Sequence, residues 1–347
     1  MLTRVEIENF KAIEKLTMDF TSRLTVIVGP NGSGKTSILQ AIDSIRFDAI
    51  PSAYRRSGSH AEPAVRLQTS YGQSRRIPSE DSEDRRTGSL RVTVGSGHDT
   101  TSAVPSPPPF GAVFLRFLGS EMRQPSLGEG NPPPLNTDGS NLASVLSSLC
   151  LNQPQRFELI KSRLRDVIPQ VHQLRFQRVR LHERDRSHAK PAAENGNGLA
   201  VGDQLLFDMQ NAVSVPADAV SEGTLLALGI ITAAVMADGQ LAVLIDDLDA
   251  SLHPTAQAEL VRAIRSIETE QAEIQLIATS HSPYLLNALQ FDEIRLTTLD
   301  DDGRVVCGRL SDHSDFERWK DEMTPGEMWG MWGESWLTKN RQEALQP

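Results

Sequence analysis

Cysteine and long apolar runs are scarce in this sequence. Only two of its 347 residues are cysteines, and Cys150 and Cys307 lie far apart, which excludes a disulfide scaffold and a cysteine metal cluster. No stretch approaches the roughly 18 consecutive apolar residues of a membrane-spanning helix. The opening MLTRVEIENF carries charges where a signal peptide needs an apolar core. We therefore expect a cytoplasmic protein that does not enter a membrane.

Positive charge is also in the minority. The chain has 35 Lys and Arg against 45 Asp and Glu, a net charge of −10, so it is not a general polycation for nucleic acid. Residues 150–190 are an exception, with ten Lys and Arg against four Asp and Glu. The basic stretch Arg156–Arg186 is typical either of a nucleic-acid surface or of helices with solvated charged faces. The sequence leaves both interpretations open.

Strand patterns alternate with helical patterns at the two ends of the chain. Residues 24–28 (LTVIV) and 241–245 (LAVLI) are continuous apolar runs, typical of strands buried on both faces. Interleaved helices predict an α/β fold with a mainly parallel sheet flanked by helices and an antiparallel β portion at the N-terminus. We expect residues 1–50 and 216–300 to form this domain together.

Residues 51–215 are predicted to be an insertion into that domain. Their first part, residues 51–110, is rich in Ser, Arg, Pro and acids and predicts a largely flexible segment. Helices are expected across residues 140–171 and strands across residues 173–209. The insertion is therefore helical and irregular before it ends in strands.

Residues 301–347 form a tail that contains every tryptophan of the chain. Thr324 and Pro325 predict a helix start, with Thr as the cap and Pro in the first position. Trp329, Trp332 and Trp336 would then share one face of that helix. Such a face usually docks on its own domain, and the alternative is an aromatic anchor for a partner.

The strongest motif is GPNGSGKT at residues 29–36. It fits the phosphate-loop pattern G-x-x-x-x-G-K-[ST], follows an apolar strand and begins a helix. Glycines let successive backbone N–H groups face phosphate oxygens, Lys35 would reach the β- and γ-phosphates, and Thr36 would bind Mg²⁺. The expected ATP-binding residues are Gly29, Pro30, Asn31, Gly32, Ser33, Gly34, Lys35, Thr36 and Ser37.

Two polar segments follow later apolar strands. After residues 241–245, Asp246 would hold Mg²⁺ and Asp247 would orient or deprotonate the attacking water. In the segment ATSHSP, His281 would contact the γ-phosphate or that water. A solvated turn explains either segment alone, but the carboxyl ends of parallel strands share one sheet edge. We therefore predict Lys35, Asp247 and His281 as catalytic residues.

A fourth motif, VSEGT, begins the helix before the acidic strand. Ser221 is a good N-cap, and capping alone would explain it. Gly223 weakens a helix, so its presence in the first turn indicates that the backbone must stay open to approach.

Together these motifs resemble the ABC-type ATPase head of the SMC and RecF group, and more closely the small stand-alone AAA-type bacterial ATPases related to the OLD family. GPNGSGKT is similar to the Walker A loop, VSEGT to the ABC signature, LAVLIDDLDASLHP to the acidic strand and IATSHSPYLL to the His switch. The opening EIENFKAI resembles the first strand and turn, near which adenine is held. The resemblance covers roughly residues 1–47 and 215–290 and implies a P-loop NTPase fold.

The resemblance implies ATP and Mg²⁺ as cofactors and a homodimer or higher homo-oligomer that closes around ATP. Ser221, Glu222 and Gly223 would then act in trans on the partner's nucleotide. It also implies control of a separately encoded effector, a nuclease or toxin, in bacterial antiphage defence, and we expect no fused effector after Gln290. The alternatives are a DNA-maintenance ATPase of RecF or SMC type and a slow-turnover scaffold that holds a toxin.

Two features depart from the family pattern. Asp247 stands where the group usually has Glu, and its side chain is one methylene shorter. A misplacement of about 1 Å can cost about a hundredfold in rate, so we expect slow turnover. No glutamine can be assigned to the Q-loop, for which Gln68 and Gln124 both remain candidates.

Overall fold

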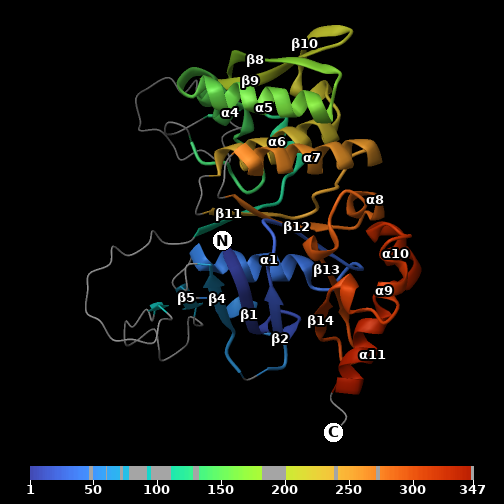
Figure 1. The fold of residues 1–347 in the computed structure, drawn as a ribbon. Helices are drawn as coiled ribbons and strands as arrows, with labels where there is room; N and C mark the ends of the chain where they lie inside the picture. Colours follow the sequence, from blue (N-terminus) through green and yellow to red (C-terminus); the bar gives the residue numbers. More distant parts are fainter. Residues whose placement is uncertain are drawn as a thin grey trace. The chain divides into compact units, whose positions relative to one another are not determined.

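The computed structural model describes residues 1–46, 50–59, 61–70, 73–77, 92–94, 111–127, 133–181, 201–237, 241–270 and 274–344. The chain divides into two compact units, which are described separately (Figure 1). Unit 1 comprises Met1–Phe114, Ala237–Leu248 and Glu270–Pro347, and unit 2 comprises Leu115–Met236 and Asp249–Thr269.

Unit 1 contains a six-stranded sheet in the order β14-β13-β3-β12-β11-β7. Strands β11, β12, β3 and β13 pair in parallel, and β14 is antiparallel to β13. Every residue of β3 is buried, as its continuous apolar run predicted. The strands are β3 (Leu24–Val28), β7 (Gly111–Leu115), β11 (Leu241–Ile245), β12 (Gln275–Ser280), β13 (Ile294–Leu299) and β14 (Val305–Gly308). The expected mainly parallel sheet is confirmed.

A second sheet of unit 1 has five antiparallel strands in the order β2-β1-β4-β5-β6. They are β1 (Leu2–Phe10), β2 (Ile13–Asp19), β4 (Ala64–Thr69), β5 (Gln73–Ile77) and β6 (Val92–Val94). The structure thus differs from the prediction of a flexible segment over residues 51–110. Val65 and Leu67 alternate with more exposed residues, so β4 can pair with β1 and bury one face. The rest of that segment lies largely outside the described residues.

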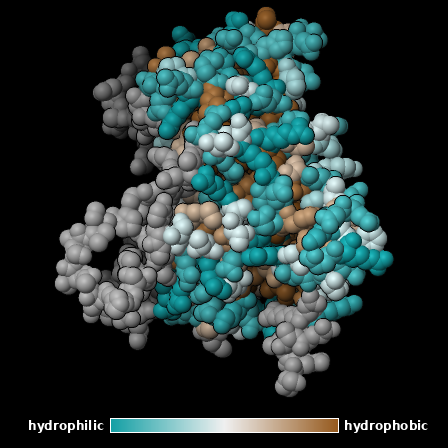
Figure 2. All heavy atoms as spheres, in the orientation of Figure 1, coloured by the Kyte–Doolittle hydropathy of each residue, from teal (hydrophilic) through white to brown (hydrophobic). Residues whose placement is uncertain are grey.

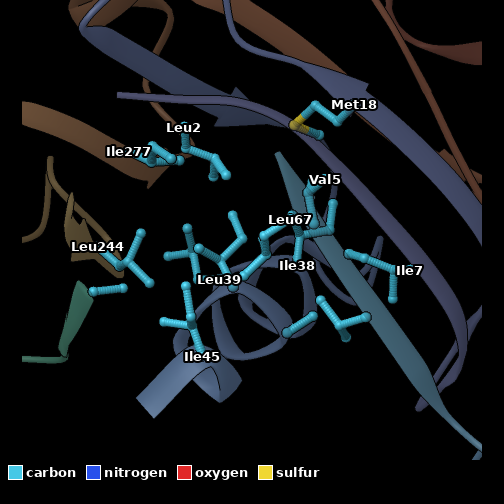
Figure 3. Close-up of a cluster of buried hydrophobic side chains, with 14 of the residues drawn as sticks. Leu2, Val5, Ile7, Met18, Ile38, Leu39, Ile45, Leu67, Leu244 and Ile277 are labelled. Carbon is cyan, nitrogen blue, oxygen red and sulfur yellow. The ribbon is translucent and has the colours of Figure 1, made fainter. Parts of the chain in front are cut away.

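Helix α1 (Lys35–Asp43) packs between the two sheets of unit 1 (Figure 3). Its Ile38 and Leu39 are fully buried in one apolar cluster. The antiparallel sheet contributes Leu2 to this cluster, and the parallel sheet contributes Leu244 and Ile277. Because apolar side chains enclose it from both sheets, the helix that follows the phosphate loop has a fixed position.

A buried glutamine joins the two sheets. The side chain of Gln275, in β12, accepts a hydrogen bond from the backbone N–H of Leu2 at 2.7 Å and donates one to the Leu2 carbonyl at 2.9 Å. These two hydrogen bonds take the place of those that a neighbouring strand would make. The buried backbone N–H and carbonyl of Leu2 are therefore both satisfied.

Among its described residues, unit 1 also contains four short α-helices, of which the last three lie in the tail after β14. They are α8 (Pro283–Leu286), α9 (Phe316–Trp319), α10 (Pro325–Trp332) and α11 (Ser335–Ala344). Thr324 caps α10 in a capping box with Glu327, which confirms the predicted helix start. The prediction that three tryptophans share one helical face is wrong. Gly333, with a φ of 60°, ends α10, and Trp336 therefore lies in α11.

Unit 2 combines helices with a three-stranded antiparallel sheet in the order β10-β9-β8. Its elements are α3 (Gly119–Met122), α4 (Leu142–Asn152), α5 (Pro154–Val167), β8 (Val171–Arg180), β9 (Val201–Met209), β10 (Ala212–Pro216), α6 (Glu222–Met236) and α7 (Pro254–Glu270). Helices α4 and α5 lie in the stretch predicted to be helical. The expected division placed residues 216–300 in one domain, whereas α6 and α7 belong to unit 2. Helix α6 is buried along almost its whole length and packs on α5 and α3, which explains this grouping.

The described part of the chain contains no helix that is both long enough and apolar enough to cross a membrane. The face shown in Figure 2 carries mostly hydrophilic residues, with apolar side chains visible in small areas between them. This surface is ordinary for a chain whose apolar residues lie mainly in its cores.

Candidate functional site

The phosphate loop connects β3 to α1 and is packed against β13 and β14. Gly29 has a φ of 151° and Gly34 a φ of 91°, values that favour glycine. A Cβ atom on Gly29 would lie 2.0 Å from the Thr297 carbonyl oxygen, and one on Gly34 would lie 2.5 Å from a methyl carbon of Val305. Both glycines are therefore required by backbone conformation and by the close approach of neighbouring strands.

The Lys35 side chain folds back onto the phosphate loop. Lys35 is 5% exposed, and its ammonium donates hydrogen bonds to the carbonyl oxygens of Gly29 at 2.9 Å and Pro30 at 2.8 Å. Ser33 is buried and its hydroxyl lies 2.8 Å from that of Thr297. Gly29 is also buried, whereas Pro30, Asn31 and Gly32 are exposed and Gly34, Thr36 and Ser37 are half-buried. A buried cation at the N-terminus of α1 suits an anionic ligand such as a phosphate.

Asp246 is held against the first turn of α1. The Thr36 hydroxyl donates to both carboxylate oxygens of Asp246 at 3.0 Å, although the two residues are 210 positions apart. Asp246 is 6% exposed. A hydroxyl and a carboxylate are the oxygen ligands that Mg²⁺ takes beside nucleotide phosphates, so these two residues fit a magnesium ion.

Thr279, in β12, connects Asp246 to the residues that follow it. Its hydroxyl donates to Asp246 Oδ1 at 2.8 Å and accepts from the Asp247 backbone N–H at 2.8 Å. Its carbonyl oxygen accepts from the Leu248 N–H at 2.9 Å. Thr279 is completely buried. No motif of the sequence pointed to Thr279, although its position two residues before His281 could have indicated a role.

Asp247 and His281 lie at the carboxyl ends of adjacent parallel strands. Ile245 of β11 is paired with Ala278 of β12, so both segments leave the sheet at the same edge. Both side chains are exposed. Asp247 has a φ of 58°, a left-handed conformation that Asp and Asn adopt more readily than Glu. The backbone at this edge therefore suits the shorter acid that the sequence carries.

The turn between β1 and β2 lies against the other end of α1. Lys11 has a φ of 52°, hydrogen-bonds the Gln40 side chain, and places its ammonium 4.5 Å from the centre of the Tyr54 ring. Partial burial lowers the pKa of Lys11. Of the two Q-loop candidates, Gln68 lies within β4 of the antiparallel sheet, and Gln124 lies in unit 2, in the segment that follows β7.

The VSEGT segment begins α6 in unit 2. Ser221 and Glu222 are exposed, and the Ser221 hydroxyl accepts from the Thr224 N–H at 3.3 Å, as an N-cap does. Gly223 is buried, and a Cβ atom there would lie 2.4 Å from the Ser251 carbonyl oxygen. The absence of a side chain at Gly223 thus has a packing cause within unit 2. This differs from the interpretation that its backbone stays open to approach.

The basic stretch Arg156–Arg186 lies on α5 and β8 as far as the structure describes it. Four of its cations form ion pairs with acids of the same unit: Lys161 with Glu158, Arg163 with Asp166, Arg175 with Asp208, and Arg178 with Asp203. These pairs reduce the local excess of positive charge. They favour the interpretation of solvated charged faces over that of a nucleic-acid surface.

Two sequence families match the chain. One, described as "AAA domain, putative AbiEii toxin, Type IV TA system", matches residues 144–287. The other, described as "AAA domain", matches residues 4–103. The first match includes the acidic strand and His281, and the second includes the phosphate loop.

Several curated proteins are similar to the chain. It is 28% identical over 353 residues to the OLD nuclease of Thermus scotoductus, covering 88% of this chain and 63% of that protein. It is 25% identical over 317 residues to the Septu protein PtuA of Bacillus mycoides, covering 84% of this chain and 40% of that protein. A segment of 41 residues is 51% identical to the chromosome partition protein Smc of Methanocaldococcus jannaschii. It covers 12% of this chain and 4% of that protein.

These matches confirm the resemblance that the motifs indicated, to AAA-type ATPases related to the OLD family and to the SMC and RecF group. The chain spans less than two thirds of the length of the OLD nuclease and of PtuA.

Replacing Thr279 by valine should weaken magnesium-dependent nucleotide binding. The change keeps the shape of the side chain and removes a hydrogen bond to a carboxylate, worth about 1.5 kcal/mol or more, so we expect a roughly tenfold higher Kd for Mg·ATP. Titration of a fluorescent ATP analogue with Mg²⁺ and with EDTA measures this effect. The matched control is Thr25→Val in β3, where a fully buried hydroxyl has no partner and the change should leave the Kd unaltered. Equal affinities for both variants would contradict the assigned role of Thr279.

Proposed function

We propose that unit 1 binds Mg·ATP at the edge of its parallel sheet and hydrolyses it slowly. The observation that supports this most is the convergence of Thr36 and Thr279 on the buried carboxylate of Asp246. A polar cluster of this kind beside a phosphate loop suits a cation that is bound together with a phosphate. The similarity to AAA-type ATPase families supports the same assignment.

Each residue of the site then has one task. Lys35 exchanges its two carbonyl partners in the loop for phosphate oxygens, while the backbone N–H groups at the start of α1 bind the same anion. Thr36 and Asp246 hold the magnesium ion, which neutralises charge on the phosphates when bound. Asp247 orients the attacking water and accepts its proton. His281 donates a hydrogen bond to the γ-phosphate or to the water.

Asp247→Asn should separate hydrolysis from binding. Asparagine has the same shape and tolerates the left-handed backbone, but it cannot accept the proton of the water. We expect turnover to fall by about a hundredfold or more with an unchanged Kd for Mg·ATP, measured by phosphate release and by equilibrium binding. Lys35→Met is the complementary variant and should lose binding itself. If Asp247→Asn turned over ATP at the wild-type rate, Asp247 would not be the group that accepts the proton of the water.

We propose further that two copies of the chain close around ATP, with the start of α6 of one copy facing the nucleotide of the other. Ser221 and Glu222 are exposed at the N-terminus of a 15-residue helix, where the backbone amides favour an anion. The resemblance to ATPase heads with an ABC signature supports this arrangement. ATP would then stabilise the dimer, and hydrolysis would release it.

Ser221→Asp and Ser221→Asn form a matched pair for this dimer. Both residues cap a helix about as well as serine, so the fold of unit 2 should be equally stable in both. Only the aspartate brings a negative charge toward the partner's triphosphate. We expect the Asp variant to need at least about tenfold more protein for ATP-dependent self-association, whereas the Asn variant stays within a few-fold of wild type. Sedimentation velocity with ATP and without nucleotide measures the difference, and equal behaviour of the two variants would exclude signature contact in trans.

We infer that the ATP-bound state controls a separately encoded effector in antiphage defence. Similarity to the OLD nuclease and to PtuA supports this role. Among the described residues, no group of three or more His, Cys, Asp and Glu side chains could hold a metal ion. In this proposal the chain supplies the nucleotide-dependent signal, and a second chain carries out the effector reaction.

Expression of the chain together with its neighbouring gene tests this role. We expect the pair to reduce phage plating and the two products to purify together, and Lys35→Met to abolish the protection because the nucleotide state no longer changes. A DNA-stimulated ATPase that binds DNA in a salt-dependent manner and gives no protection would favour the DNA-maintenance alternative instead.

A further inference from the structure

Helix α10 of the tail is docked on α8, the short helix that follows His281. The backbone N–H of Gly326, in the first turn of α10, donates to the Asn287 side-chain oxygen at 2.9 Å. A Cβ atom on Gly326 would lie 2.1 Å from the carbonyl oxygen of Pro283, the first residue of α8. The two backbones therefore approach so closely that only glycine fits between them.

The bond from Gly326 to Asn287 also completes the N-terminus of α10. The first N–H groups of a helix have no partner within the helix. Thr324 accepts from the Glu327 N–H, and Pro325 has no N–H to satisfy. Asn287 serves the N–H that remains between them. The start of α10 is thus capped partly by its own sequence and partly by the segment on which it docks.

The other end of α10 is anchored independently of α8. The Trp332 ring stacks on the His313 imidazole, with ring centres 4.1 Å apart and planes inclined by 2°. Trp336 meets the same imidazole edge-on at 5.1 Å. Met328, on the inner side of α10, is completely buried. These contacts hold α10 in place, so the helix against which α8 packs has a defined position.

The connection from α8 back to His281 is very short. Only Ser282 separates His281 from Pro283, and the Ser282 N–H donates to the Ser280 hydroxyl at 3.0 Å. The Ser282 carbonyl accepts from the Leu286 N–H at 3.4 Å. A shift of Pro283 is therefore transmitted to His281 through two peptide units that have little freedom to absorb it.

We propose that Gly326 and Asn287 are positioning residues for His281, and that the contact between α10 and α8 sets where the imidazole meets the nucleotide. This inference rests on the proposed ATPase function. The phosphate loop and Asp246 are held by different contacts, through the loop carbonyls that bind Lys35 and through the hydroxyls of α1 and β12. The tail thus acts on the chemical step and leaves ATP binding alone.

Gly326→Ala and Gly330→Ala test this role in one helix. Both changes replace glycine by alanine in α10, but a Cβ atom on Gly326 meets the Pro283 carbonyl, whereas one on Gly330 meets nothing within 4 Å. We expect Gly326→Ala to lower kcat about tenfold or more with KM for ATP within about twofold, because a misplacement near 1 Å can cost about a hundredfold. Gly330→Ala should match wild type. Circular dichroism and thermal melting confirm that each variant is folded.

A second pair of variants acts on the same contact without adding bulk to α10. Asn287→Leu removes the acceptor for the Gly326 N–H, and Asn287→Asp retains an acceptor oxygen that the helix N-terminus favours. We expect a loss of kcat in the Leu variant and its rescue in the Asp variant. This pair decides the question if Gly326→Ala does not fold.

His281→Ala distinguishes positioning from a general weakening of the structure. In that background, Gly326→Ala should cause no further fall in kcat, since the group that it displaces is already absent. A further fall of the same size as in wild type would overturn the proposal, and so would an unchanged kcat in Gly326→Ala itself. Absence of turnover in the wild-type protein would overturn the proposed ATPase function, and this inference with it.

Discussion

Parallel pairing of β3 with β12, and of β12 with β11, is the constraint on which the candidate site depends. Val28 at the end of β3 is paired with Ser280, and Ile245 at the end of β11 is paired with Ala278. Three segments that are distant in sequence therefore leave the sheet at one edge. The phosphate loop, the acidic pair and His281 lie close together because each directly follows one of these strands.

Hydroxyl groups determine how the acids are held once the strands have brought them together. A buried carboxylate without partners would be costly, and Asp246 receives hydrogen bonds from Thr36 and Thr279. Thr279 also binds the N–H of Asp247 and thereby helps to hold a residue with a left-handed backbone. One buried threonine thus supports both acids, and the second acid remains exposed where a water molecule could reach it.

The C-terminal tail of unit 1 packs against two elements that adjoin the candidate site. Val305 of β14 fills the space beside Gly34, and Leu337 of α11 fills the space beside Gly308 of the same strand. The C-terminal helices therefore support the strand that supports the phosphate loop. On the other side of the site, α10 supports the turn after His281. The C-terminal helices thus support the site, although all of its sequence motifs lie earlier in the chain.

The sequence by itself determined the parallel sheet, the phosphate loop and the candidate residues Lys35, Asp246 and His281, because local signals of apolar strands, glycines and polar strand ends encode them. It did not determine strands β4 and β5, whose surroundings have the composition of a loop, or the break at Gly333, where the pattern is that of a continuing helix. The role of Thr279, the packing of Gly223 on Ser251 and the docking of Gly326 on Pro283 were decided only by tertiary structure. Each depends on a contact between segments that are distant in sequence. Hydrophobic periodicity reports only which face of one helix or strand is buried, so it does not predict such contacts.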